Sequence, residues 1–565
     1  MKNLKVHFKL IIFFLYFINS FNILAAKSID KFSNAKDISN YFSGILAIND
    51  NQYQESYKYL RSLDDLENSH YRYSQYFHYT LIALNKLKDA KNYSKELEKK
   101  NIDNFESNLI SGVYYLENKD LEKAHIYFKK LTDNNQPGSL QNLIASTLNI
   151  WTDIKNFDST LNRLDATSKK YENIKKIQKV FAYCYFDSTK TDGVFKKLTS
   201  NPRVNYSRYF FFHTNYLISK NYKKKAKKVL QSSLSIYPEN LILNQLKIDL
   251  EKNNLSNNQF DCKNTSHIIA EIFYIAATAL SVQENYFASN FYLNLAKYLN
   301  PNFVSYDTLY AENFYIMEQY SESKKIYEKI KNYGLIYSWY ASKQIASITI
   351  KQNEKEKAKK YLKKNFQQIK NPSIYQIFDY AEFLKNNEKF KKSIQYYSEV
   401  IKKVDKKNKL YSKALNGRGV AYERTEQWKK AESDLLNSLS LFPNDAYIIN
   451  YLAYSWIEKG INIDKSLIML RKANELRPND GYIIDSLGWA LFKLKNYKES
   501  KKYLELAVSR MASDPVINDH YADSLWMNNN NLQARYYWNY VLKLKKTEEK
   551  LKNKIKQKIL SGLKN

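Results

Sequence analysis

Glycine and proline are scarce in this sequence. The chain has 565 residues but only 11 Gly and 8 Pro, whereas average usage would give roughly 40 and 28. Sheets with tight hairpins and glycine-rich phosphate loops need glycine, because it adopts their backbone conformations without steric cost. A chain this poor in both residues is expected to be almost entirely helical.

Residues for catalysis and metal binding are also few. Two cysteines, Cys184 and Cys262, are too few for a disulfide framework or a zinc site, and we favour two separately buried thiols over a disulfide between them. The 7 histidines are scattered, and no H-x-x-x-H, G-x-S-x-G or G-x-x-x-x-G-K motif occurs. We interpret His520, beside Asp519, as part of a polar helix face. The sequence therefore predicts no enzyme, no cofactor and no metal site.

Long apolar runs are rare as well. Three lysines precede an apolar stretch from Leu10 to Leu24, and Ala25 and Ala26 follow it. We interpret residues 1–26 as a secretory signal peptide cleaved after its last residue. An uncleaved membrane anchor is the alternative, although the run is short for a span and is broken by polar groups. We identify no second stretch of about 18 apolar residues, so the mature chain is predicted to have no transmembrane segment.

Basic residues outnumber acidic ones, 89 against 57, which gives a net charge of +32. Such an excess can indicate an anionic partner. It can also reflect an AT-rich genome, since Lys, Asn, Ile, Tyr and Phe are all abundant. The lysines are spread along the chain in short runs that are typical of solvated helix faces. We therefore do not favour a nucleic-acid ligand, but an anionic surface stays open as a partner.

The clearest pattern is an internal repeat of about 34 residues. Counted from Gly419, the positions at offsets 3, 9, 12, 16, 19 and 24 are Tyr422, Trp428, Ala431, Leu435, Ser438 and Pro443. Equivalent units start at small residues separated by 34 to 38 positions: Ala277, Ala311, Ala346, Ala381, Gly419, Ala453, Gly488 and Ala522. Each unit predicts two antiparallel helices, in which the small residues permit close approach. Since one helix pair cannot bury its apolar face alone, the pairs must stack.

This pattern resembles the tetratricopeptide repeat, strongly from about residue 266 to 545. The N-terminal half carries it more weakly, with Gly44, His78 and Gly112 spaced by 34 residues. The resemblance implies an all-α, right-handed superhelical solenoid of about 13–15 antiparallel helix pairs at ~34 residues each. The predicted organisation is a signal peptide (1–26), divergent repeats (27–250), a polar Asn-rich linker (251–265), a C-terminal array (266–545) and a basic helix or tail (546–565).

Three segments resemble a family of exported repeat proteins of alphaproteobacteria. They span residues 270–303, 450–500 and 514–544, and they include the runs NYLAYSWIEKG and DPVINDHYADSLW. The resemblance implies an envelope protein without catalytic residues whose molecular role is not established. It places the protein in the periplasm, or on the periplasmic face of the outer membrane, of a Gram-negative bacterium.

In this architecture the first helix of each pair faces an inner groove. Positions six and three before, and one and four after, the small residue are expected to be exposed there. The candidate ligand-binding residues at these positions are Asn416, Asn450, Tyr454, Tyr482, Asp485, Trp489, Asp519, Asp523 and Trp526. Aromatic side chains with a few carboxylates and amides suit recognition of a protein or peptide segment, and the carboxylates favour a basic ligand. The alternative is that the aromatic residues pack between neighbouring pairs.

We therefore expect an interaction scaffold of the cell envelope that binds an unidentified protein or peptide through this groove. A second hypothesis is binding to lipid, lipopolysaccharide or glycan through the positive charge. A third is an accessory subunit of an envelope biogenesis complex. Binding in the groove should survive moderate salt, whereas binding through exposed charge should weaken as the screening length falls to ~8 Å.

Overall fold

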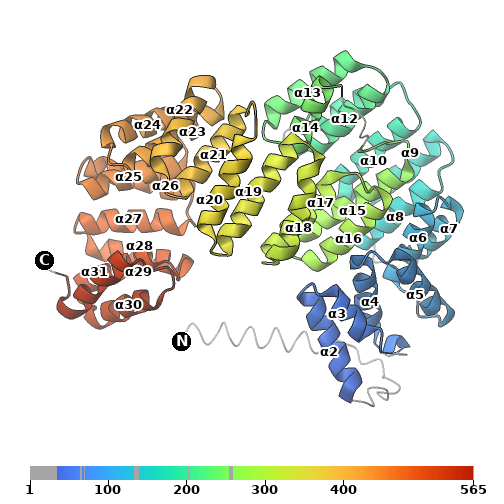
Figure 1. Ribbon diagram of the computed structural model, residues 1–565, viewed down its shortest axis with the longest axis horizontal. Coiled ribbons are helices and arrows are strands. Elements are labelled where there is room, and N and C mark those ends of the chain that lie inside the picture. Colours follow the sequence, from blue (N-terminus) through green and yellow to red (C-terminus); the bar gives the residue numbers. More distant parts are fainter. Residues whose placement is uncertain are drawn as a thin grey trace. The chain divides into compact units, whose positions relative to one another are not determined.

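A computed structural model describes residues 35–63, 66–68, 70–132, 139–201, 203–253 and 259–563. The predicted signal peptide lies outside these residues. The chain forms two compact units, which we call unit 1 (Met1–Asn365) and unit 2 (Phe366–Asn565). The described residues of both units are helical and contain no β-strand (Figure 1). The predicted all-α solenoid is thereby confirmed.

Helices α2 to α20 belong to unit 1, and the last of them runs two residues past its end. They are α2 (Ala35–Asn49), α3 (Tyr53–Leu60), α4 (Tyr71–Ala83), α5 (Leu87–Lys99), α6 (Phe105–Glu117), α7 (Leu121–Lys130), α8 (Leu140–Thr152), α9 (Phe157–Asp165), α10 (Glu172–Tyr185), α11 (Thr191–Thr199), α12 (Ser207–Ser219), α13 (Lys223–Ile236), α14 (Leu241–Glu251), α15 (Thr265–Val282), α16 (Tyr286–Leu299), α17 (Val304–Ile316), α18 (Tyr320–Ile330), α19 (Leu335–Lys351) and α20 (Lys355–Gln367). Three 3-10 turns, η1 (Leu66–Asn68), η2 (Lys169–Tyr171) and η3 (Lys331–Tyr333), join some of them.

Unit 2 continues the pattern with eleven helices among the described residues. They are α21 (Ile374–Asn386), α22 (Phe390–Lys403), α23 (Lys409–Glu423), α24 (Trp428–Leu441), α25 (Ala446–Lys459), α26 (Ile463–Leu476), α27 (Gly481–Lys493), α28 (Tyr497–Arg510), α29 (Pro515–Met527), α30 (Asn531–Lys543) and α31 (Glu549–Ser561).

The turn within each pair confirms the predicted register. The seventh residue after every small residue from Ala277 to Ala522 has a positive φ, which ends the first helix. These residues are Glu284, Glu318, Asn353, Glu388, Glu426, Gly460, Lys495 and Asn529. The weaker N-terminal trio follows the same rule, with Asn51, Asn85 and Lys119 seven residues after Gly44, His78 and Gly112.

Fourteen consecutive helix pairs can be assigned in the described residues, within the predicted range of 13–15. Two helices, α14 and α31, remain without a second helix. After α14 the described residues form no helix until α15 begins. The pattern is therefore interrupted once inside unit 1 and ends on a single helix in unit 2.

Helices α15 and α16 fill the inner side of unit 1. They contact α8, α4 and α6, which are the first helices of early pairs (Figure 1). Tyr79 of α4 lies 4.8 Å from Phe287 and 4.3 Å from Phe291 between ring centroids. Arg208 of α12 donates to the Glu271 carboxylate of α15 at 2.7–3.1 Å, and the Glu271 side chain is fully buried.

Helix α15 corrects one expectation from the sequence. Its 18 residues have a mean hydropathy of 1.4, so by length and composition it could cross a membrane. We expected no second stretch of this kind, and that expectation was wrong. Nine of its residues are buried within unit 1, among them Glu271 and Phe273, and this burial accounts for its apolar composition.

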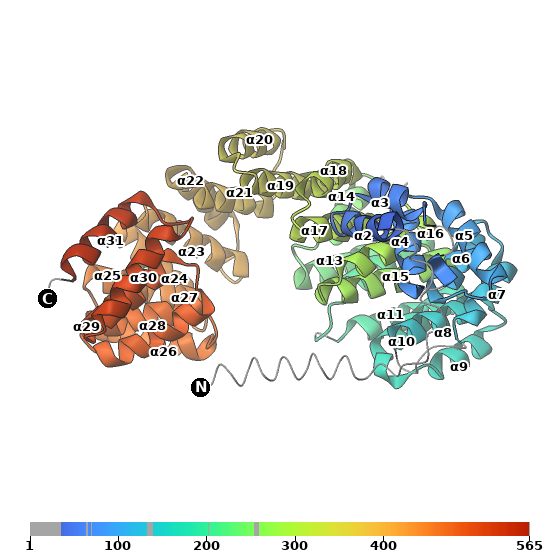
Figure 2. The same cartoon turned by 90° about the horizontal axis from the view of Figure 1, so that it is seen from below.

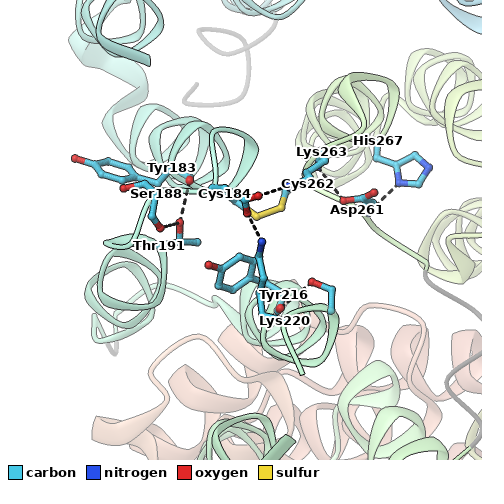
Figure 3. The surroundings of a disulfide bond; sticks show 12 residues. Tyr183, Cys184, Ser188, Thr191, Tyr216, Lys220, Asp261, Cys262, Lys263 and His267 are labelled. Atoms are coloured by element: carbon cyan, nitrogen blue, oxygen red, sulfur yellow. Dashed lines mark hydrogen bonds and ion pairs between the residues drawn. A yellow bond between two sulfur atoms is a disulfide. The ribbon is translucent and has the colours of Figure 1, made fainter. Parts of the chain in front are cut away.

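The described residues of the predicted linker, 251–253 and 259–265, lie inside unit 1, and the two units divide between Asn365 and Phe366. Cys262 forms a disulfide with Cys184 of α10, with Cα atoms 6.0 Å apart (Figure 3). The preference for two separate thiols was therefore wrong. Cysteines 78 positions apart carry no sequence signal of pairing, since the stacking of α10 against this segment brings them together.

Candidate binding face of unit 2

The nine candidate residues lie on the first helices α23, α25, α27 and α29, as expected, but their exposure differs widely. Tyr482 is 53% exposed. Asn416, Asn450, Tyr454 and Trp526 are half-buried. The remaining four are buried, with exposed fractions of 3–9%: Asp485, Trp489, Asp519 and Asp523. The expectation that all of these positions are exposed is therefore wrong for the carboxylates and for Trp489.

Asp485 and Trp489 are covered by His520 of the next first helix. The Asp485 carboxylate lies 3.0 and 3.1 Å from His520 Nδ1. The Trp489 ring stacks on the His520 ring with centroids 3.9 Å apart, and its Nε1 donates to Glu458 Oε1 at 2.6 Å. Burial alone would lower the pKa of His520, but the neighbouring carboxylates, led by Asp485, raise it above its usual value. The imidazole ring of His520, held between a carboxylate and an indole ring, joins α27 to α29.

Asp519 and Asp523 are covered by the C-terminal helix α31. Lys558 Nζ donates to both carboxylates at 2.7–2.9 Å. Trp538 Nε1 donates to Asp523 Oδ1 at 3.0 Å. Burial and the adjacent Asp519 carboxylate raise the pKa of Asp523 to about 6, although Lys558 opposes this shift. The predicted basic ligand of these carboxylates is thus the protein's own lysine.

Trp526 is also covered by the end of the chain. Gly562 follows α31 with φ +69° and lies directly against the indole ring, so a Cβ at this position would overlap it. The Arg535 guanidinium lies 5.0 Å from the centroid of the same ring. Figure 2 shows α31 alongside α30. The predicted basic C-terminal cap is therefore a helix that closes the last repeat.

The exposed part of the face is an edge formed at the start of three first helices. We call it the exposed edge, and it consists of Tyr447, Tyr482 and Val516, which are 54%, 53% and 47% exposed. Tyr447 Oη donates to Asp480 Oδ2 at 3.1 Å, and Tyr482 Oη donates to Asp514 Oδ2 at 3.5 Å. Asp480 is the N-cap of α27 and Asp514 is the N-cap of α29. The other carboxylate oxygen of each accepts backbone N–H groups at the start of the helix that it caps. The two rings are consequently held in place before any partner arrives.

The exposed edge adjoins a polar strip on α23 and α25. The amide oxygens of Asn416 and Asn450 are buried and have no hydrogen-bond partner within the described part of the chain. Tyr454 follows Asn450 by one helical turn, and burial raises the pKa of its hydroxyl, with Glu458 and Asp485 adding to the shift. Because the two amide oxygens are enclosed by the protein, the exposed edge itself is the part of this face that a partner can contact.

Sequence reasoning missed His520, Glu458 and Lys558 as partners of the candidate residues. His520 does lie on a polar helix, but it is 7% exposed and pairs with Asp485 rather than with its sequence neighbours. One period of 34 residues after Ala522 falls within α31, which therefore occupies the place of another first helix. This signal could have placed Lys558 opposite α29, the preceding first helix. No group of three or more His, Cys, Asp or Glu side chains that could hold a metal ion occurs in the described ranges.

The helix pairs, their register and their stacking define an α-solenoid with one partly open inner face. A profile of the tetratricopeptide repeat matches residues 484–510, which cover most of α27 and α28. Together with the repeat register, this match shows that the chain is a tetratricopeptide-repeat protein. Proteins of this kind are generally non-catalytic scaffolds that bind other proteins.

The similarity to individual proteins is low. A TPR repeat-containing protein of Pseudomonas aeruginosa is 26% identical over 137 residues, a match that covers 24% of this chain and 22% of that protein. Among solved structures, Cut9–Hcn1 of the APC/C is 12% identical with a TM-score of 0.33, over 81% of this chain and 97% of that one. A thermophilic TPR protein of Thermus thermophilus is 12% identical with a TM-score of 0.30, over 33% and 100%. MamA of Desulfovibrio magneticus is 14% identical with a TM-score of 0.27, over 31% and 97%.

Proposed function

We propose that the protein is an exported, non-catalytic scaffold of the cell envelope that holds a protein or peptide partner on unit 2. The observation that carries the proposal is the exposed edge, in which the side chains of Tyr447, Tyr482 and Val516 are about half exposed. Tyrosines at fixed positions give a large contact area at low entropic cost. The two rings would contact the partner directly and set its sequence preference.

Two features support the location. The N-terminal residues have the basic start, apolar run and small residues of an export signal. The Cys184–Cys262 disulfide fits an oxidising compartment such as the periplasm, because cytosolic thiols are normally kept reduced. Fractionation of cells expressing the full chain, with the masses of the recovered N-terminus and of the cysteine-containing peptides, tests both.

The partner is tested by crosslinking and pull-down from envelope fractions. The buried residues Asp485, Asp519 and Trp489 are poor choices for substitution, since their variants would report on folding. Tyr447→Ala with Tyr482→Ala removes the two rings of the exposed edge instead. Leu532→Ser with Tyr536→Ala is the matched control, since these α30 residues are 85% and 68% exposed but lie on a second helix.

The scaffold proposal expects defined proteins that are captured by wild type and by the control and are lost from the edge variant. Capture should persist at about 0.3 M salt, where exposed charges are well screened. If all three forms capture the same lipid or glycan, and salt abolishes it, the edge is not the site. The net charge of +32 would then carry the function as an anionic-surface binder.

A further inference from the structure

Unit 1 contains a cavity of about 560 Å³ beside α14, the first helix without a second helix in the described residues. Its walls come from α12, α14, the η3 turn before α19, and Gln259. This volume is within the range of small-molecule sites in proteins, about 300–1,000 Å³. The cavity therefore lies within unit 1, where the repeat is incomplete in the described residues.

The wall that carries Gln259 is fixed by neighbouring contacts. Asn300 Nδ2 donates to the Gln259 carbonyl oxygen at 2.9 Å. The Phe260 ring stacks on Phe212 with centroids 3.9 Å apart, and the Cys262 disulfide ties the segment to α10 (Figure 3). Lys263 also forms an ion pair with Asp187, one position beyond the C-cap of α10.

The opposite wall is also held in place. Gln245 Oε1 accepts from Ile336 N at 3.0 Å, and Gln245 Nε2 donates to Asp249 Oδ1 at 2.8 Å. Gly334 has φ +140° and lies against the Gln245 side chain, where a Cβ would overlap it. The cavity is therefore preformed and does not depend on a ligand to shape it.

The side chains of Asn215 and Gln259 also line this space. Asn215 Nδ2 and Gln259 Oε1 are themselves enclosed by the protein and have no hydrogen-bond partner among the described residues.

Charges of opposite sign lie on the α14 wall. Asp249 and Lys252 are three residues apart on one face of the helix. Gln245 donates to one carboxylate oxygen of Asp249, which leaves the second oxygen available. Phe211 and Leu246 add buried apolar surface between the polar groups.

We propose that this cavity binds a small zwitterion of the size of a dipeptide. The ligand's ammonium group would face the Asp249 carboxylate. Its carboxylate would face the Lys252 ammonium group, and its side chains would lie against Phe211 and Leu246. This inference goes beyond the scaffold function and does not depend on it, because the cavity and the exposed edge share no residue.

The test is isothermal titration calorimetry of the full chain with three ligands: leucyl-leucine, its N-acetylated form and its C-amidated form. We expect the free dipeptide to bind, and each blocked form to bind at least about tenfold more weakly, equivalent to 1.4 kcal/mol. Binding by all three forms alike, or no heat up to about 5 mM dipeptide, would overturn the proposal.

Two variants place the site. Lys252→Gln changes an exposed side chain and should weaken the free dipeptide while leaving the amidated form unchanged. Asp249→Asn should weaken the free dipeptide and leave the acetylated form unchanged. The control is Asp158→Asn, which removes an exposed carboxylate of α9 elsewhere in unit 1. Wild-type affinity in the Lys252 variant would refute the assignment even if the Asp249 variant fails to fold.

Discussion

The inner faces of the two units differ in what covers them. In unit 1 the first helices α4, α6 and α8 contact α15 and α16 of the same unit, so their inner sides are buried. In unit 2 the corresponding helices leave Tyr447, Tyr482 and Val516 exposed, and only the last pair is covered by α31. The same repeat thus builds an interior in one unit and a surface in the other.

The difference follows from a few substitutions on one scaffold. Helix α15 can lie inside unit 1 because it is apolar and because its single carboxylate, Glu271, meets Arg208. Unit 2 places Asp485, Asp519 and Asp523 at similar inner positions and neutralises them with His520 and Lys558. Because a buried charge is costly without a partner, both units pair these inner carboxylates with basic side chains.

The largest expected effect comes from breaking the buried ion pair of unit 1. Glu271→Ala leaves the Arg208 guanidinium without its partner and should destabilise unit 1 by about 3–5 kcal/mol. Hydrogen exchange measured by mass spectrometry should show lost protection in α12 and α15 and unchanged protection in α25 to α29. Replacing both residues by Met is the control and should be close to neutral. Equal loss in both units would mean that they do not fold as separate units.

The disulfide should have the next largest effect, again confined to unit 1. Serine at both Cys184 and Cys262 should lower the free energy of unfolding by about 2–4 kcal/mol, since the bond restricts the unfolded chain. The measurement is urea denaturation with and without a dithiol reductant. Reduction should destabilise wild type to the level of the double variant and leave the variant unchanged. A variant as stable as oxidised wild type would contradict the structural role of the bond.

A smaller effect distinguishes unit 2 by its pH dependence. The pKa of His520 is raised in the folded state, so its contribution is complete below the unfolded value of about 6.5 and is lost as the pH rises through the folded value. The pKa of Asp523 is also raised, from 3.8 to about 6. Its contribution to stability is therefore also lost as the pH rises, between about pH 4 and about pH 6. Unit 2 should therefore lose stability as the pH rises above about 6.5. His520→Gln should reduce this slope, as measured by urea midpoints in a series of buffers on both sides of that pH, whereas an unchanged slope would exclude His520 as its source.

The smallest effect on stability is expected at the exposed edge. Tyr447→Ala and Tyr482→Ala each remove a solvent-facing ring and should change the free energy of unfolding by no more than about 0.5 kcal/mol. Thermal melts of the variants used for pull-down provide the measurement. A loss of several kcal/mol would mean that the tyrosines stabilise unit 2 and would remove the basis for assigning them to binding.

Much of the fold could be predicted from the sequence because the small residue of each pair is visible in it. Where that residue is Gly or Ala, the predicted register agrees with the turns. Between 138 and 265 the repeat looks degenerate, and there the residues seven positions before Asp187, Asn221 and Asn253 are Val180, Thr214 and Leu246. These larger side chains are buried all the same, so the architecture persists although its sequence signal is lost.

The candidate site was less predictable. The 34-residue period places Asp485 and Asp519 on the inner side of their helices, and the structure agrees on that placement. It does not specify which side chain of the next helix approaches them. His520 comes from the following pair and Lys558 from the end of the chain, so the burial of these carboxylates depends on contacts between repeats. The disulfide and the cavity beside α14 depend on such long-range contacts too.

The position of α31 has a consequence for how molecules meet one another. A stack of repeats is a one-dimensional lattice, and its last layer presents the surface that every inner layer buries. Lys558 and Gly562 occupy that surface on α29 and so end the lattice within one molecule. A chain that stopped after Leu544 would expose two acidic groups and the Trp526 ring, and a head-to-tail contact at such an end extends into filaments when it does not close. We therefore expect a chain without α31 to associate into polymers more readily than the full chain.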